Sequence, residues 1–244
     1  DKDFLQVYMG TGSVMSPNQI KYTKQEFVDA EDEIAALPEK ICHEYRMLEH
    51  APIISDFQES CGVGFVGSRE RLSVMLKQVT LDLAVRHFYN DVKFVYIFDG
   101  ADAERFQWVG WLKNVYNDRL DIKNIVCDKE SRNAVLEYLY QELSAREQQT
   151  AESKDYAPEN FYIVFVMDGS VISRHPVSRY IEQCSRYGFT FVFFEEYEER
   201  LPQGCTEIIR LASPDKNSLI RTQNGDVSAE FSYKEIADET AALA

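Results

Sequence analysis

The chain has 244 residues, which allows one large domain or one domain with a small appendage. Hydrophobic residues make up 45% of it, so it can bury a substantial core and is not globally disordered. Its formal net charge of −15 at pH 7 disfavours partners that are nucleic acids or anionic lipid surfaces. The scattered, odd set of cysteines is typical of reduced thiols and not of a disulfide framework or a zinc site; they are Cys42, Cys61, Cys127, Cys184 and Cys205.

The N-terminal part, residues 1–50, predicts a small β element followed by a helix. Residues 4–9 alternate like a strand, which we expect to end at the GTG that follows, and residues 18–23 predict a second short strand. Apolar residues then recur at helical spacing over residues 31–48. Pro38 interrupts that pattern, so we expect a kinked helix or two short helices. We expect this N-terminal element to pack on the core of the domain.

A repeated alternation of strands and helices follows, within residues 51–235. The predicted strands are nearly continuous apolar runs, which indicates a parallel sheet that is covered on both faces. The predicted strands are residues 63–66, 92–99, 122–127, 160–168, 189–195, 207–212 and 229–234, and the predicted helices are residues 70–88, 103–115, 131–150 and 176–188. The fold class is therefore α/β, with three layers and a mostly parallel sheet. Residues 236–244 are interpreted as a tail or a linker.

The stretch GVGFVGSRER at residues 62–71 lies between a predicted strand and a predicted helix, where a phosphate-binding loop would lie. A Walker A loop reads G-x-x-x-x-G-K-[ST]: its glycines let backbone amides curl around phosphates, its lysine reaches the outer phosphates and its hydroxyl holds Mg²⁺. With Gly64 aligned to the first glycine, Arg69 replaces the second glycine, Glu70 replaces the lysine and Arg71 replaces the Ser/Thr.

These three replacements remove what phosphate binding requires. Arg69 adds a side chain where backbone freedom is needed. Glu70 puts negative charge where the triphosphate would be neutralised, and at about 4 Å with an effective dielectric near 20 each such contact costs roughly 4 kcal/mol. We therefore predict that this stretch, including Gly67 and Ser68, is a vestigial phosphate loop that does not bind ATP in the usual way. Glu70 in the first turn of a helix instead favours the helix dipole.

Two predicted strands end in an aspartate, as a Walker B strand does: YIVFVMDG ends at Asp168 and FVYIFDG ends at Asp99. Gly169 follows Asp168, so the usual residue that orients the attacking water is missing. Two interpretations stay open. Each aspartate caps the turn after its strand, or the two together hold Mg²⁺ in a non-standard ATP site.

Trp108 and Trp111 are three residues apart in the predicted helix 103–115, which places them on one face. Core packing is one interpretation. The other is an anchor for a partner protein, because tryptophan is enriched at binding hot spots. We retain the pair as a candidate partner contact.

Several stretches together resemble one protein family: DFLQVYMGTGSV, GFVGSRERL, DLAVRHFYNDVKFVYIFD, WVGWLKNVYN and YIVFVMD. From about Asp3 to Leu219 the chain resembles the membrane-proximal, degenerate ATPase-like domain of the FtsK/SpoIIIE-type ATPase of type VII secretion systems in Firmicutes. The resemblance implies a RecA-like, P-loop NTPase-like core. Only Gly64, Gly67, Ser68 and Asp168 match an active site of that family. It therefore implies no catalytic residue and no required cofactor, with ATP and Mg²⁺ as the alternative ligands.

The resemblance also implies a cellular setting. It implies a long ATPase anchored by transmembrane helices outside this sequence, with this domain on the cytoplasmic side of the cell membrane. The implied partners are downstream ATPase domains of the same chain, other membrane components of the secretion system and sister subunits in a ring, with no nucleic acid. We expect a pseudo-ATPase domain that acts in assembly and in coupling the motor to the membrane complex. The alternative is a domain that binds ATP and hydrolyses it weakly.

Overall fold

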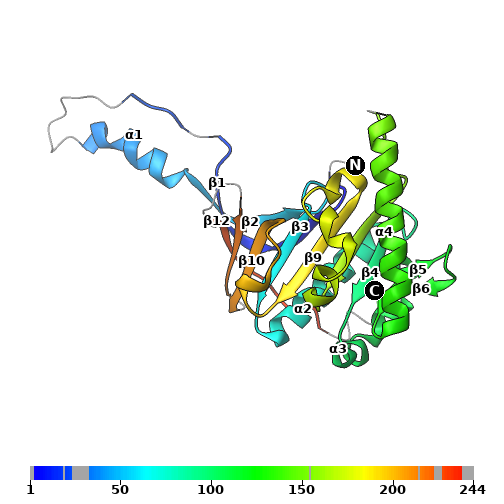
Figure 1. Ribbon diagram of the computed structural model, residues 1–244. Helices are drawn as coiled ribbons and strands as arrows, with labels where there is room; N and C mark the ends of the chain where they lie inside the picture. Colours follow the sequence, from blue (N-terminus) through cyan, green and yellow to red (C-terminus); the bar gives the residue numbers. More distant parts are fainter. Residues whose placement is uncertain are drawn as a thin grey trace.

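One large mixed sheet, with helices on both of its faces, organises the chain (Figure 1). The computed structural model describes residues 3–18, 20–23, 33–153, 155–213, 215–222 and 227–237. In these residues the strand order of the ten-stranded sheet is β2-β1-β12-β11-β10-β3-β9-β8-β4-β7. Its strands are β1 (Gln6–Met15), β2 (Met47–Asp56), β3 (Gly62–Gly67), β4 (Val92–Ile97), β7 (Ile125–Val126), β8 (Phe161–Val166), β9 (Phe189–Glu195), β10 (Cys205–Ser213), β11 (Lys216–Arg221) and β12 (Val227–Ser232).

The helices connect these strands. The α-helices are α1 (Glu33–Glu44), α2 (Arg69–Arg86), α3 (Gly100–Arg105), α4 (Lys129–Glu152) and α5 (Gly169–Ser173). The 3₁₀ helices are η1 (Gln107–Trp111), η2 (Lys113–Val115), η3 (Pro176–Tyr180), η4 (Cys184–Tyr187) and η5 (Glu198–Arg200). A short antiparallel pair, β5 (Tyr116–Asn117) and β6 (Ile122–Lys123), lies outside the large sheet.

The parallel half of the sheet confirms the predicted α/β class. Strands β10, β3, β9, β8, β4 and β7 are mutually parallel neighbours, whereas β2, β1, β12 and β11 extend the sheet beyond β10 by antiparallel pairing. Along β4, Phe94 and Tyr96 belong to the core cluster that α2 covers, and Val95 and Ile97 belong to the cluster that α4 covers. This period of two buries both faces, as the unbroken apolar run predicts.

The order of the parallel strands creates a crevice at one edge of the sheet. The chain leaves β3 through α2 and returns at β4, β8 and β9, so that β9 lies beside β3. After β9 the chain crosses to β10, on the other side of β3. Connections that leave neighbouring strands in opposite directions open a crevice at their carboxyl ends, where open α/β sheets bind ligands.

The N-terminal element differs from the prediction. β1 does not end at the GTG but continues to Met15, because Gly12 packs against the backbone of β12: a Cβ on Gly12 would lie 1.9 Å from the Glu230 carbonyl oxygen. The strand that pairs with β1 at the sheet edge is β2. Residues 18 and 20–23 form no strand, and Gln19 of that predicted strand lies outside the described residues.

The helix predicted over residues 31–48 is shorter, and its side chains at residues 34 and 36–44 are not buried. α1 contains Pro38, ends at Glu44, and is followed by β2 from Met47; residues 31 and 32 lie outside the described part of the chain. Figure 1 shows α1 projecting from the body of the molecule, and its Leu37 and Ile41 are exposed, where packing on the core was expected. β2 also crosses the predicted boundary at residue 50, and the division into domains stays a prediction.

Other elements are split or were missed. The predicted helix 103–115 is α3, η1 and η2; the helix 176–188 is η3 and η4; and the strand 122–127 is divided between β6 and β7. β11 was not predicted. Of the predicted tail 236–244, residues 238–244 lie outside the description.

Among the helices that the structure describes, none combines the length and apolar character that crossing a membrane requires.

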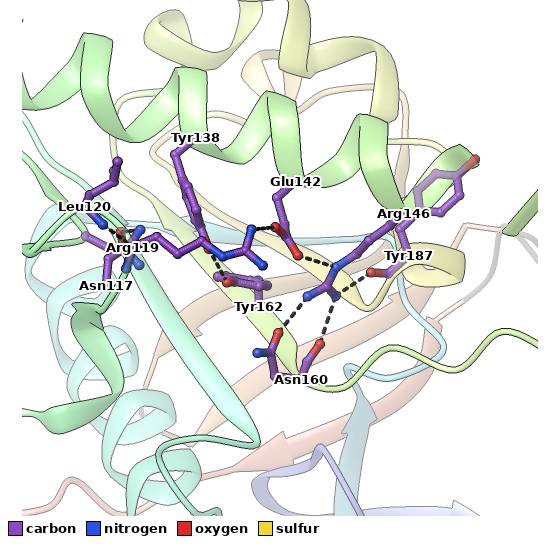
Figure 2. A network of polar contacts seen from close by, with 10 residues as sticks. Asn117, Arg119, Leu120, Tyr138, Glu142, Arg146, Asn160, Tyr162 and Tyr187 are labelled. Carbon is purple, nitrogen blue, oxygen red and sulfur yellow. Dashed lines mark hydrogen bonds and ion pairs between the residues drawn. The ribbon is translucent and has the colours of Figure 1, made fainter. Parts of the chain in front are cut away.

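A buried arginine joins three elements at the amino edge of the parallel sheet (Figure 2). Arg146 of α4 is 4% exposed. Its guanidinium donates to the Glu142 carboxylate at 2.9 Å, to the Tyr187 carbonyl at 2.8 Å and to the Asn160 carbonyl and side chain at 2.9 and 2.6 Å. It also lies over the Tyr162 ring, 5.2 Å from the centroid. Arg146 therefore ties α4 to the loop before β8 and to η4.

We predict that Arg146→Met lowers the free energy of unfolding by about 3 kcal/mol, because it leaves buried carbonyls without a donor and removes a buried cation. The matched control is Arg119→Met. Arg119 binds the same Glu142 carboxylate at 2.8 Å, but its side chain is 72% exposed, so this change should cost less than about 1 kcal/mol. Urea denaturation of the two variants measures both values, and equal losses would contradict the assignment.

Candidate functional site

The candidate site is the carboxyl edge of β3, β4, β8 and β9, which contains most of the sequence-predicted site residues. β3 ends at Gly67 and α2 begins at Arg69, so Ser68 alone joins the strand to the helix. Ser68 has extended backbone angles and makes no side-chain capping bond. A single residue cannot form a loop that curls around a phosphate group. The structure therefore has a direct strand-to-helix joint at the place where a phosphate loop was aligned.

The glycines aligned with the Walker A motif lie within β3 and serve packing. Gly64 is buried in mid-strand, and a Cβ there would lie 2.4 Å from Cδ1 of Leu201. A Cβ on Gly67 would lie 3.0 Å from both Cβ and the carbonyl oxygen of Leu211 on the neighbouring strand β10. Both glycines thus permit close approach of other parts of the fold, a role that does not require a ligand.

Arg69 fills the space beside the joint with an ion-pair cluster. Its Nη2 atom lies 2.9 Å from Oδ2 of Asp99, at the end of β4, and 2.7 Å from Oδ2 of Asp102, on α3. The Asp102 side chain is only 2% exposed. Burial raises the pKa of the Asp102 carboxyl, and the Arg69 cation opposes that rise. The arginine that replaces the second Walker A glycine is therefore a structural counter-ion.

The other replaced positions also have structural contacts. Glu70 is exposed in the first turn of α2, as predicted, where its charge favours the helix dipole. Nη1 of Arg71 donates to the Leu211 carbonyl at 3.1 Å and so ties α2 to β10.

Both candidate Walker B aspartates cap helices. The Asp99 carboxylate accepts the Asp102 amide at 2.8 Å at the start of α3, and this bond, together with Arg69, lowers the pKa of Asp99. The Asp168 carboxylate accepts the Ser170 hydroxyl at 2.6 Å and the Ser170 amide at 3.2 Å at the start of α5. Both aspartates thus make the contacts that the capping interpretation expects.

A cavity of about 710 Å³ nevertheless opens between these two aspartates, and its lining is acidic. Asp99, Asp168, Glu182 and Glu195 line it, with Arg200 as the one cation among its lining residues. Burial raises the pKa of Glu195, and the charge of Asp168 raises it further. Arg200 and the Gly169 amide act in the opposite direction and lower it. A triphosphate would meet more carboxylates than cations here. Among the described residues, no three His, Cys, Asp or Glu side chains are grouped so as to hold a metal ion.

Gly169, at the position of the missing second acid, is constrained by a neighbour. A Cβ on Gly169 would lie 2.7 Å from Oε1 of Glu195. A side chain at residue 169 would therefore require Glu195 to move. Sequence reasoning missed Asp102, Glu182, Glu195 and Arg200, because none of them lies at a Walker position.

The two tryptophans have different surroundings. Trp108 is half-buried and packs against the core cluster under α2, whereas Trp111 is 89% exposed. Both residues lie in one helix, as predicted, but that helix is the short 3₁₀ helix η1 and not a helix over residues 103–115. Only Trp111 has the exposure that a partner contact needs.

We predict that Gly64→Ala destabilises the domain by about 1 to 3 kcal/mol, because the new methyl group displaces Leu201. Gly100→Ala is the control: nothing lies within 4 Å of a Cβ there, so its effect should stay within about 0.5 kcal/mol. Chemical denaturation compares them. A neutral Gly64→Ala would show that the glycine has no packing role.

We predict that Arg69→Met costs about 1 to 2 kcal/mol at neutral pH and less in acid. Without the cation, the folded-state pKa of Asp102 rises further above its ordinary value of 3.8, so the folded state holds the proton more tightly than the unfolded state. The stability of the variant then falls as pH rises from about 3.8 through the raised pKa, relative to wild type. Denaturation at a series of pH values measures this loss, and a pH-independent loss would contradict it.

Comparisons with known proteins agree with the predicted resemblance. No protein-family model matches the chain. The type VII secretion system protein EssC of Staphylococcus aureus strain MSSA476 is 26% identical over 239 residues, covering 96% of this chain and 16% of EssC. The ESX secretion system protein EccC of Geobacillus thermodenitrificans is 25% identical over 221 residues, covering 89% of this chain and 15% of EccC.

Solved structures share the fold at low sequence identity. EssC (ATPases 2 and 3) from Geobacillus thermodenitrificans superposes with a TM-score of 0.61 and 11% identity, covering 97% of this chain and 46% of that one. Thermomonospora curvata EccC (ATPases 2 and 3), solved with a signal sequence peptide, gives a TM-score of 0.54 and 12% identity over 77% of this chain and 39% of that one. The chain spans about 16% of the length of its curated relatives. Over almost all of its own length, the chain is similar in sequence to one segment of the EssC and EccC type VII and ESX secretion system proteins.

Proposed function

We propose that the chain is a pseudo-ATPase domain of a type VII secretion ATPase and that it works by contact instead of by nucleotide chemistry. The observation that supports this most directly is the joint at Ser68, where β3 passes into α2 without a loop. Arg69, which follows the joint, is held by Asp99 and Asp102 and is not directed at a free phosphate site. The acidic lining of the neighbouring cavity adds electrostatic repulsion of a triphosphate.

The proposed setting is suggested by the relatives, which are named as type VII and ESX secretion system proteins. The domain lies on the cytoplasmic side of the cell membrane, and transmembrane helices outside this sequence anchor its parent protein. Its partners are the downstream ATPase domains, other membrane components of the secretion system and sister subunits. Its task is to assemble the motor and to couple it to the membrane complex. An α/β core that keeps its packing without a phosphate loop suits such a task.

One observation favours a second candidate, a weak ATP site. Asp99 and Asp168 line one cavity of about 710 Å³, which is large enough for a small ligand. In that function the two carboxylates would leave their capping bonds to hold Mg²⁺. Each capping bond would then have to be replaced by water.

Calorimetric titration of the chain with Mg²⁺ and a non-hydrolysable ATP analogue tests the proposal. We predict no saturable heat up to millimolar nucleotide, because Ser68 alone joins β3 to α2, and Glu70 and Arg71 stand where the lysine and the magnesium-binding hydroxyl would be. Binding at micromolar concentrations would contradict the pseudo-ATPase assignment. Asp168→Asn then discriminates: loss of that binding would support the second candidate, whereas binding that survives it would place the nucleotide elsewhere.

A further inference from the structure

Exposed apolar side chains gather on the projecting N-terminal segment. Nine of the sixteen exposed large hydrophobic residues in the described part of the chain lie between Met15 and Leu48. We call α1 with the outer ends of β1 and β2, residues 13–15 and 47–50, the arm. In Figure 1 the arm extends away from the rest of the molecule. An apolar surface of this kind marks an interaction site on a soluble domain.

The arm presents its apolar side chains as a stripe. Leu37, Ile41 and Tyr45 are spaced by four residues, and the Tyr45 amide still donates to the Ile41 carbonyl at 3.0 Å, so the three share one helical face. All three are exposed. A helix with one apolar face is the element that docks into a groove in many protein complexes.

A second apolar surface lies at the other end of the fold. The carboxyl end of α2 and the segment η1–η2 enclose a cavity of about 540 Å³, which we call the Trp111 groove. Val85, Phe88 and Trp111 line it and are exposed. Arg86 and Lys113 also line it, and none of its lining residues is a carboxylate, although the chain as a whole is acidic. Nε2 of His87 in the same lining is buried without a hydrogen-bond partner among the described residues.

The arm and the Trp111 groove cannot meet within one copy. Arg86, in the groove, donates to the Gln6 carbonyl at the start of β1. β1 then runs for ten residues and ends at Met15, within the arm. At about 3.3 Å per residue this strand carries the arm roughly 30 Å from Gln6, and α1 projects further still.

We propose that the arm of one copy docks into the Trp111 groove of the next copy. The stripe supplies the apolar contacts for Val85, Phe88 and Trp111. Charge adds to the fit through Lys113, because α1 contains three glutamates and one lysine, whereas Arg86 in the groove is already paired with Asp82 at 2.6 Å. This chemistry favours a protein over an anionic lipid surface, which would attract a basic helix. Because the two surfaces differ, the contact is heterologous and produces a ring or an open chain of copies.

This proposal names the surfaces through which sister subunits would contact each other. It rests on the proposed function, which includes assembly with sister subunits. It makes no use of nucleotide. A failure of the assembly experiment below and a failure of the ATP titration are therefore separate results.

Sedimentation velocity of the whole 244-residue chain over a concentration series tests the proposal. We expect wild type to associate, and we expect Ile41→Glu in the arm and Trp111→Glu in the groove each to weaken association by roughly 30-fold or more. Tyr197→Glu, an exposed aromatic position outside both surfaces, is the matched control and should associate like wild type. Circular dichroism confirms that each variant is folded. A wild-type chain that stays monomeric overturns the proposal.

Mixing the two variants identifies the occupant. Ile41→Glu retains an intact groove and Trp111→Glu retains an intact arm, so the mixture can form one good interface and should give a heterodimer that grows no further. If arms instead pair with arms, Trp111→Glu alone would associate like wild type. If the partner is another protein or a membrane, neither the wild type nor the mixture would associate. Either result overturns the proposal.

Discussion

The ion-pair cluster of Arg69 with Asp99 and Asp102 is the interaction on which the candidate site depends. It holds the first turn of α2 against the end of β4 and the start of α3, which follow Arg69 by 30 and 33 residues in sequence at Asp99 and Asp102. Asp102 is buried and needs a cation, and Arg69 is in place because α2 begins directly after β3. A flexible phosphate loop at this position would separate the helix from the strand and move the arginine away. The cluster and the short joint therefore support one another.

In the crevice next to this joint, the polar side chains likewise make structural contacts. In open α/β sheets the carboxyl ends of the strands are the usual place for a ligand. Here Asp99 and Asp168 direct their oxygens at helix amides, and Glu195 occupies the space beside Gly169. The fold keeps its packed core on both faces of the sheet, while the polar groups at its edge are used for capping and pairing.

The sequence predicted the parallel core well because its strands are buried on both faces. Within the predicted strand 160–168, residues 161–167 form an unbroken apolar run that a half-exposed strand would not have, and β8 lies in this run. The prediction of one helix over residues 176–188 was wrong, and the reason is again the pattern of burial. Val177, Tyr180, Cys184 and Tyr187 are buried as a helical period requires, but 3₁₀ turns with three residues each produce a similar spacing. The spacing of the apolar residues therefore predicted which side chains are buried, but it did not distinguish an α-helix from 3₁₀ turns.

The site was harder to predict because it depends on contacts that are distant in sequence. The Walker A alignment identified which motif positions differ in the sequence, but it could not show that Gly64 lies inside a strand, where a Cβ would meet Leu201. Nor could it show that GTG continues β1, since the reason is the backbone of β12 more than 200 residues later. Asp102 has no motif of its own. It gains a role only when the fold brings Arg69 within 2.7 Å.

A double-mutant cycle between Arg69 and Asp102 tests this account most directly. The free energies of unfolding of Arg69→Met, Asp102→Asn and the double variant are measured at neutral pH and compared with that of the wild type. The account predicts a coupling energy of about 1 to 2 kcal/mol, because removing either partner alone leaves the other one unpaired. Additive effects, within about 0.5 kcal/mol, would contradict it and would reopen the joint after β3 as a place for a ligand.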